Sequence, residues 1–152
     1  MHDTKDYIIP TRSLSESQSI KSALQVLMEE HSSGLPVTDS TGKLLGFFST
    51  YKLIALLLPR AMTISPLGLR DLSFVADSLG HIREKMSEIA NDKVGAHMYT
   101  PDYQVYPDTP ITELMLLLHR EENRLPVADR ATGKLVGIVS ATGLLELIGK
   151  DS

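Results

Sequence analysis

The chain has 152 residues, a formal net charge of −4 at pH 7 and no cysteine. A chain of this length buries about 70% of its unfolded surface, so it can fold without a disulfide or a metal. A cysteine-free chain has no disulfide framework, no thiolate nucleophile and no cysteine-held zinc or iron–sulfur site, and its composition is consistent with a reducing cytoplasm. Because both signs of charge are mixed along the chain without a basic run, we do not expect it to bind nucleic acid.

The sequence also argues against a membrane span and a secretory signal. Its longest uninterrupted apolar run, Leu53–Leu58, is far shorter than the roughly 20 residues that cross a bilayer. The first residues, MHDTKDYIIP, lack a basic segment followed by an apolar core, so a signal peptide is not expected. The sequence therefore predicts a cytoplasmic α/β protein that does not associate with membranes.

The first group of predicted elements ends near residue 58. A short extended piece at Arg12–Leu14 precedes a helix, which is indicated by apolar residues at i, i+3, i+4, i+7 and i+8 from Ile20. The segment LPV, starting at Leu35, begins a strand, DSTGK has turn chemistry, and KLLGFFS is rich in strand-forming residues. These two strands are expected to form a hairpin, and YKLIALLL predicts a closing helix.

Residues 59–95 follow a different pattern. HIREKMSEIAND is typical of a helix, and Ile82, Met86 and Ile89 at i, i+4 and i+7 form a narrow apolar stripe on it. LRDLSFVADSL predicts a second, short helix. This helical insertion either covers the core of its own chain or offers a dimer contact or docking surface.

The elements of the first group recur in the last third of the chain. GKLLG at Gly42 and GKLVG at Gly133 lie 91 residues apart, and an extended piece at Gln104–Tyr106, a helix, LPV and a closing helix surround the second copy in the same order. The chain is therefore a tandem duplication with the order β-α-β-β-α in each copy. We expect a first repeat at 5–58, the insertion at 59–95 and a second repeat at 96–149.

The order LPVxD, GKLxGxxS and a closing helix resembles the CBS domain, named after cystathionine β-synthase, and two in tandem resemble a Bateman module. The second copy, LPVAD followed by GKLVGIVS, is the more specific match. The resemblance implies an α/β fold of two β-α-β-β-α repeats related by a pseudo-twofold axis, with clefts between them. It also implies a regulatory module that binds AMP, ADP, ATP or S-adenosylmethionine there and that forms a homodimer through its repeats.

The serine that ends each GKLxGxxS segment leads into a helix N-terminus, where backbone N–H groups and a hydroxyl make an anion site. These serines are Ser49 and Ser140. The family pattern continues Ser/Thr-x-x-Asp, with the aspartate on the ribose, but this chain has Lys52 and Gly143 at that position. Losing such a charge-assisted hydrogen bond costs about 1.5–3 kcal/mol, or about 10- to 100-fold in affinity. Tight binding of AMP therefore does not follow from the resemblance.

Several candidate residues keep two interpretations. Lys52 could attract phosphates or be a solvated lysine, and Gly143 could enlarge the second cleft or serve the backbone at the helix start. Arg124, which precedes LPV, could reach a phosphate or point into solvent. The resemblance places Tyr103 on the adenine side of the same cleft. The expected ligand-binding residues are Ser140, Gly143, Thr142, Arg124, Leu125, Pro126, Tyr103, Ser49 and Lys52.

Two functions remain in view. The first is a regulatory module that senses an adenosine-type nucleotide by population shift, which a dimer partner or a separate effector protein reads. The alternative is a ligand-free dimerisation or assembly domain, which the two missing carboxylates favour. We do not expect an enzyme or a metal site, because the sequence shows no nucleophile–base motif and its histidines lack metal-ligand spacing. The sequence leaves open whether the chain is a piece of a larger protein.

Overall fold

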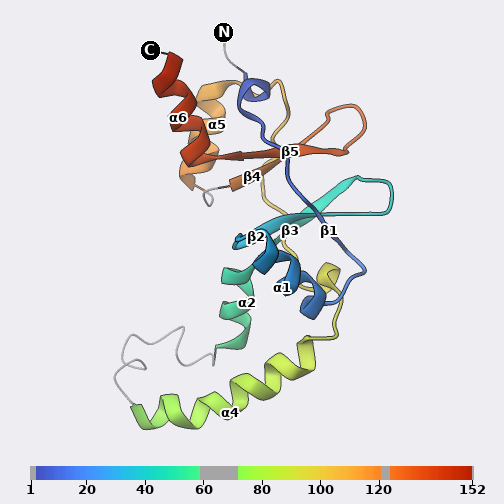
Figure 1. The fold of residues 1–152 in the computed structure, drawn as a ribbon, viewed down its shortest axis with the longest axis vertical. Coiled ribbons are helices and arrows are strands. Elements are labelled where there is room, and N and C mark those ends of the chain that lie inside the picture. Colours follow the sequence, from blue (N-terminus) through green and yellow to red (C-terminus); the bar gives the residue numbers. More distant parts are fainter. Residues whose placement is uncertain (1–2, 59–71, 121–123, 152) are drawn as a thin grey trace.

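The computed structural model describes residues 3–58, 72–120 and 124–151, which form two stacked lobes and one long helix that extends from the lower lobe (Figure 1). The fold is α/β and contains two repeats with the same order of elements, as the sequence predicted. The first repeat contains β1 (Leu14–Ser15), α1 (Ile20–Glu29), β2 (Gly34–Thr38), β3 (Leu44–Ser49) and α2 (Thr50–Leu57), and the second contains α5 (Ile111–Arg120), β4 (Arg124–Ala128), β5 (Leu135–Ser140) and α6 (Ala141–Asp151). Two short 3-10 helices, η1 (Thr4–Tyr7) and η3 (Val94–Ala96), and the helix α4 (Leu72–Ile89) complete the described elements.

Each repeat is built on an antiparallel hairpin. In the first, β1 adds a parallel strand to β2, and β2 pairs with β3. In the second, β4 pairs with β5, and a parallel bridge between Val105 and Val127 takes the place of β1. The extended pieces expected at 12–14 and 104–106 are therefore present, although the first begins at Leu14.

Each hairpin packs its helices around a separate apolar core. The stripe predicted from Ile20 faces the first core at Ile20, Ala23 and Leu27, which are buried there. Its last residue, Met28, does not, since it is 78% exposed. Ser19 caps this helix by accepting the N–H of Ser22 at 3.1 Å. The buried residues of the second core are Tyr7, Val105, Leu114, Leu117, Leu118, Leu125, Val127, Val139 and Leu144.

Each lobe is completed by the segment that precedes the other repeat. Ile9 exchanges two backbone hydrogen bonds with Ile138 of β5, at 2.9 and 3.0 Å. Tyr99 does the same with Phe47 of β3, at 2.8 and 2.9 Å. The N-terminal segment thus lies on the second lobe, beside α5 and α6 (Figure 1). This reciprocal exchange interlocks the two repeats.

The second glycine of each GKLxG motif makes room for the exchanged segment. A Cβ atom added to Gly46 would lie 2.7 Å from the carbonyl oxygen of Tyr99, and one added to Gly137 would lie 2.5 Å from that of Ile9. Real Cβ atoms do not approach backbone oxygens this closely. The motif therefore requires glycine because another chain segment crosses directly over it.

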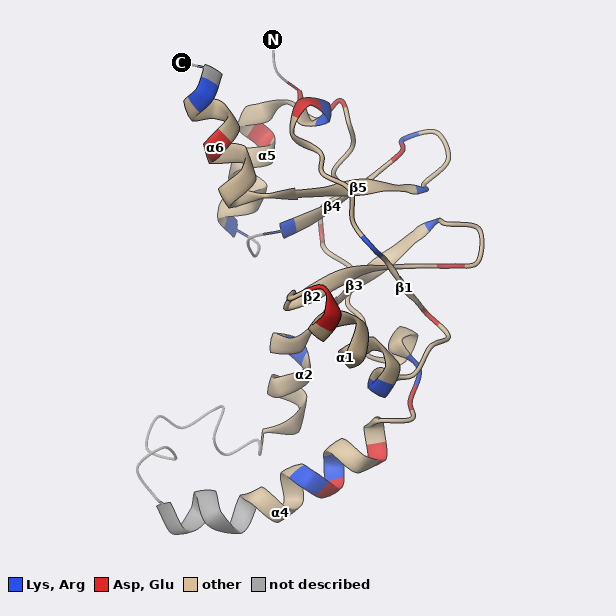
Figure 2. Cartoon of the chain, viewed as in Figure 1, with Lys and Arg blue, Asp and Glu red and all other residues tan. Residues whose placement is uncertain are grey.

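The two hairpin tips pair with each other. Leu44 donates its backbone N–H to the carbonyl of Gly133 at 2.9 Å, and Leu135 donates to the carbonyl of Gly42 at 3.0 Å. These reciprocal bonds flank an antiparallel bridge between Lys43 and Lys134, and basic residues lie at both tips (Figure 2). The pseudo-twofold axis that relates the repeats passes through this contact.

Aspartates organise both hairpin turns. Asp39 Oδ1 accepts the N–H of Thr41 at 2.8 Å, its hydroxyl at 2.6 Å and the N–H of Lys43 at 3.0 Å. Asp129 Oδ2 accepts the N–H and hydroxyl of Thr132, both at 2.8 Å. The side-chain hydrogen bond from the threonine hydroxyl is the main reason that the pKa of each aspartate lies below its usual value.

These lowered pKa values predict a dependence of stability on pH. Because the folded state favours the carboxylates, their contribution is fully present above the pKa of the unfolded carboxyl, near pH 4, and is lost as pH falls through the lower folded pKa. We expect the double variant Asp39→Asn and Asp129→Asn, which keeps an accepting oxygen in each turn, to lose less stability than the wild type between pH 6 and pH 3. Urea unfolding at both pH values measures this, and identical losses in the two proteins would contradict it.

The insertion differs from the prediction in one respect. The sequence predicted two helices, but α4 runs without a break from Leu72 to Ile89, while residues 69–71 of the predicted short helix lie outside the described residues. Gly80 lies inside this helix; a helical glycine costs about 1 kcal/mol relative to alanine but does not end a helix. At the C-terminal end Ile89 is buried in the first core and Met86 packs against it, so this end covers its own chain.

The other end of α4 extends away from both lobes (Figure 1). Its middle carries charges of both signs (Figure 2). Among the helices that the structure describes, none combines the length and apolar character that a bilayer crossing requires.

Candidate ligand-binding cleft between the repeats

A cleft of about 540 Å³ lies between the lobes. It forms at the ends of the hairpins opposite their tips, because Gly34 pairs with Ser49 and Arg124 pairs with Ser140 at the positions where the helices α2 and α6 begin. The described residues that line it come from both repeats, and none of them is acidic. They are Ser33, Gly34, Phe47, Tyr51, Arg124, Ser140 and Thr142.

The two predicted serines cap the helices that start at the cleft. Ser49 Oγ accepts the N–H of Tyr51 at 3.2 Å, and Ser140 Oγ accepts the N–H of Gly143 at 3.0 Å. Ser140 lines the cleft, whereas Ser49 is 2% exposed and lies behind the lining. Both helices thus direct their N-terminal, partly positive ends toward this region.

Arg124 reaches across the cleft to the other repeat. Its Nη1 donates a hydrogen bond to Ser32 Oγ at 2.9 Å. That hydroxyl in turn donates to the carbonyl of Gly34 at 2.7 Å and accepts the N–H of Gly34 at 3.2 Å. Arg124 therefore bridges the two lobes at the cleft rather than pointing freely into solvent.

Lys52 and Gly143 stand where the family pattern has aspartate, but their surroundings differ. The Nζ of Lys52 lies 4.9 Å from the centre of the Tyr99 ring, and Lys52 is not among the residues that line the cleft. A Cβ added to Gly143 would lie 2.9 Å from Ser140 Oγ, the atom that caps this helix. The glycine therefore leaves room for the cap, which favours its conformational interpretation.

Tyr103, Leu125 and Pro126 gather at a second, much smaller cavity. It has a volume of about 20 Å³ and is also lined by residues of β3. A space of this size holds about one water molecule and no ring. Tyr103 Oη accepts a hydrogen bond from Arg120 Nη1 at 3.1 Å. The structure thus divides the predicted set. Arg124, Ser140 and Thr142 line the large cleft, whereas Tyr103, Leu125 and Pro126 line the small cavity.

The first repeat contributes residues that the sequence analysis did not single out. Phe47 and Tyr51 form one wall of the large cleft, beside Ser33 and Gly34. The duplication was the signal that could have found Tyr51, because it lies 91 residues before Thr142, which was predicted. Within the described residues, no group of three histidine, aspartate or glutamate side chains is placed to hold a metal ion.

The family model of the CBS domain matches the chain twice, at residues 4–59 and 94–150. Among curated proteins, the chain is 33% identical over 146 residues to CBS domain-containing protein CBSX2, chloroplastic, of Arabidopsis thaliana. It is 31% identical over 129 residues to CBSX1, chloroplastic, of the same organism. The matches cover 89% and 80% of this chain but only 58% and 52% of those proteins, so the chain spans little more than half of their length.

Solved structures agree with this assignment. The crystal structure of CBSX2 from Arabidopsis thaliana has a TM-score of 0.75 and 25% identity, and the match covers 99% of this chain and 96% of that one. A structure of CBSX2 in complex with AMP has a TM-score of 0.71 and 26% identity, over 99% and 98% of the two chains. A protein from Geobacillus kaustophilus, with a TM-score of 0.76 over 99% and 98% but 19% identity, supports the fold alone. Since both repeats match the family model, the chain belongs to the CBS-domain family and contains a pair of CBS domains.

Proposed function

We propose that this chain is a regulatory module that senses an adenosine-type nucleotide, AMP, ADP, ATP or S-adenosylmethionine, in the cleft between its repeats. The observation that carries the proposal is the cleft itself: about 540 Å³, lined by Arg124 and Ser140, with no acidic residue among its described lining. Ligand pockets typically have volumes of about 300–1,000 Å³. The solved complex of the related CBSX2 with AMP supports the ligand class.

The module acts by binding, not by catalysis. A ligand that contacts Tyr51 in one lobe and Arg124 in the other binds best to one relative arrangement of the lobes. It therefore shifts the population toward that arrangement, by at most its difference in affinity for the two states. A homodimer partner or a separate effector protein responds to the change.

The proposal includes a cytoplasmic location, which suits the cysteine-free composition. Both curated relatives are named chloroplastic. Imaging of a tagged chain distinguishes the two compartments.

Thermal melting against AMP, ADP, ATP and S-adenosylmethionine tests the proposal. A ligand present at 100 times its dissociation constant stabilises the folded chain by about 2.7 kcal/mol. For a chain of this size, the melting temperature rises by about 2–4 °C per kcal/mol. We expect a selective rise of several degrees with at least one of the four ligands, and no rise with any of them at millimolar concentration would contradict nucleotide sensing.

One observation favours the alternative, a ligand-free dimerisation or assembly domain. Ile54 on α2 and Leu145 on α6 occupy equivalent positions in the two repeats, and their side chains are 53% and 61% exposed. Exposed apolar residues on equivalent helices suit contact with a second chain. Light scattering during the same ligand titration separates the functions, because an assembly domain keeps its dimer mass and its melting temperature with every nucleotide.

A further inference from the structure

The two walls of the large cleft come from duplicated segments but differ in chemistry. The position of Arg124 in the second repeat is held by Gly34 in the first, since each directly precedes LPV. Thr142 is replaced by Tyr51 at the equivalent position. The duplication therefore produced one cleft with a polar, cationic wall and an aromatic wall.

The aromatic wall depends on the missing side chain at Gly34. A Cβ added there would lie 2.5 Å from Cε2 of Phe47, so the phenylalanine ring occupies the space that a side chain would take. The ring is thus fixed on the cleft wall, where it is 4% exposed. Tyr51 beside it is 63% exposed, so its ring is free to stack on a planar group.

The opposite wall offers hydrogen-bond donors and a positive charge. Arg124 is an exposed residue, and Ser140 and Thr142 lie beside it at the start of α6. The guanidinium group has five N–H donors, and its Nη1 bonds to the neutral hydroxyl of Ser32. A hydrogen bond between a guanidinium and an anion is stronger than one to a neutral hydroxyl, so an anionic ligand would compete for this group.

From this asymmetry we infer that the cleft takes one ligand per chain in one orientation, with a planar ring on Tyr51, beside the buried Phe47, and an anionic group on Arg124. The inference rests on the proposed function and specifies how the nucleotide would be held. It makes Arg124 and Tyr51 the specificity-determining residues, and it does not use the small cavity at Tyr103.

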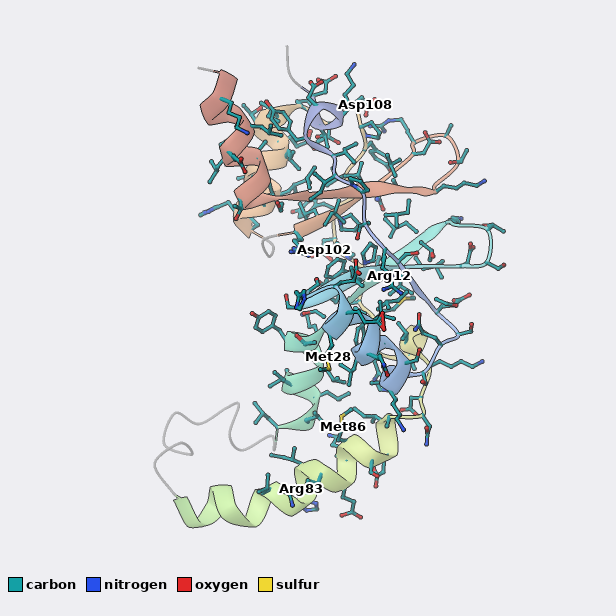
Figure 3. The ribbon with its side chains drawn as sticks, viewed as in Figure 1. Arg12, Met28, Arg83, Met86, Asp102 and Asp108 are labelled. Carbon is teal, nitrogen blue, oxygen red and sulfur yellow. The ribbon has the colours of Figure 1, made fainter. Side chains whose placement is uncertain are left out.

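The experiment compares two probes, ADP and inorganic tripolyphosphate, which carries charge without a ring. Isothermal titration of the wild type should give one ADP per chain. Arg124→Gln should weaken both probes by about 10- to 100-fold, the effect of losing a hydrogen bond to a charged group. Tyr51→Ala should weaken ADP and leave tripolyphosphate unchanged. The matched control is Arg83→Gln, the same change on α4 far from the cleft (Figure 3), which should bind both probes as the wild type does.

The outcomes separate this inference from the proposed function. If ADP binds equally well to the wild type, Arg124→Gln and Tyr51→Ala, nucleotide binding stands but the inferred orientation is overturned. Two ADP molecules per chain overturn it as well. If tripolyphosphate binds in an Arg124-dependent way but no adenosine compound binds, the proposed function fails and the ring contact on Tyr51 is also overturned, while the anion contact stands. Binding of neither probe overturns the inferred orientation, and the proposed function then fails as well if AMP, ATP and S-adenosylmethionine give no rise in melting temperature. Circular dichroism of each variant confirms that it is folded before titration.

Discussion

Replacing Gly137 with alanine is expected to lower the free energy of unfolding by about 3 kcal/mol, the upper part of the range for overpacked sites. The added Cβ would lie 2.5 Å from the carbonyl oxygen of Ile9, which is part of a paired backbone and cannot rotate away as a side chain can. To relieve this steric overlap the segment around Ile9 must move away from β5, and that motion lengthens both hydrogen bonds between Ile9 and Ile138. Urea unfolding followed by circular dichroism measures the loss.

Gly149→Ala is the matched control for this substitution. Apart from its chain neighbours and the nearby backbone of its own helix, no heavy atom of the described residues lies within 4 Å of a Cβ added there, and Gly149 lies inside α6. Because alanine has a higher helix propensity than glycine, the control variant should be as stable as the wild type or more stable, by up to about 1 kcal/mol. Equal stability of the Gly137 and Gly149 variants would show that the exchanged segment yields easily and would contradict the interpretation of the motif glycine.

Periodicity and duplication were enough to predict most of the fold. Local sequence signatures predicted the helix that begins at Ile20, the strands that contain LPV and the hairpin turns that contain Gly-Lys. Each of them matches a feature of the structure. The exchange of Ile9 and Tyr99 between the lobes could not be predicted in this way, because it joins segments that are about 130 and 50 residues distant from their partners. No local sequence pattern in these segments identifies the strand with which each of them pairs.

The site was predicted less completely, for a related reason. Arg124, Ser140 and Thr142 were found because they lie in the better-preserved copy of the motif, and they share the large cleft. Phe47 and Tyr51 were not singled out, because a strand phenylalanine and a helix-start tyrosine look like packing residues in the sequence. Lys52 was considered for the cleft on sequence spacing alone, while its side chain contacts the ring of Tyr99, which the exchange brings from another part of the chain.

The exchange also has an energetic consequence. The first core contains Ile89, the last residue of α4, and Val94 from η3, and the second contains Tyr7 from η1. Neither core is therefore made only from the residues of its own hairpin and helices. Loss of one lobe removes buried apolar contacts and backbone pairs from the other, so we expect the two repeats to unfold together in a single transition.

Phe48→Ala tests this coupling with the largest effect that we expect from one core substitution. Phe48 is 1% exposed in the first core, and truncating a buried phenylalanine costs about 3–5 kcal/mol. Domains of this kind are stable by only about 5–15 kcal/mol in total, so the variant should unfold at a far lower urea concentration. Amide resonances of Val37 in the first lobe and Val127 in the second, followed by NMR, should disappear at the same urea concentration.

Met28→Ala, also an apolar truncation in the first repeat, is the control. Its side chain lies on the surface of α1 (Figure 3) and the residue is 78% exposed, so the free energy of unfolding should change by no more than about 0.5 kcal/mol. If Phe48→Ala melts the first lobe while the resonance of Val127 persists to higher urea, the lobes are independent. In that case the exchanged strands only align the repeats, and a ligand in the cleft would have to couple two lobes that are not coupled in the free chain.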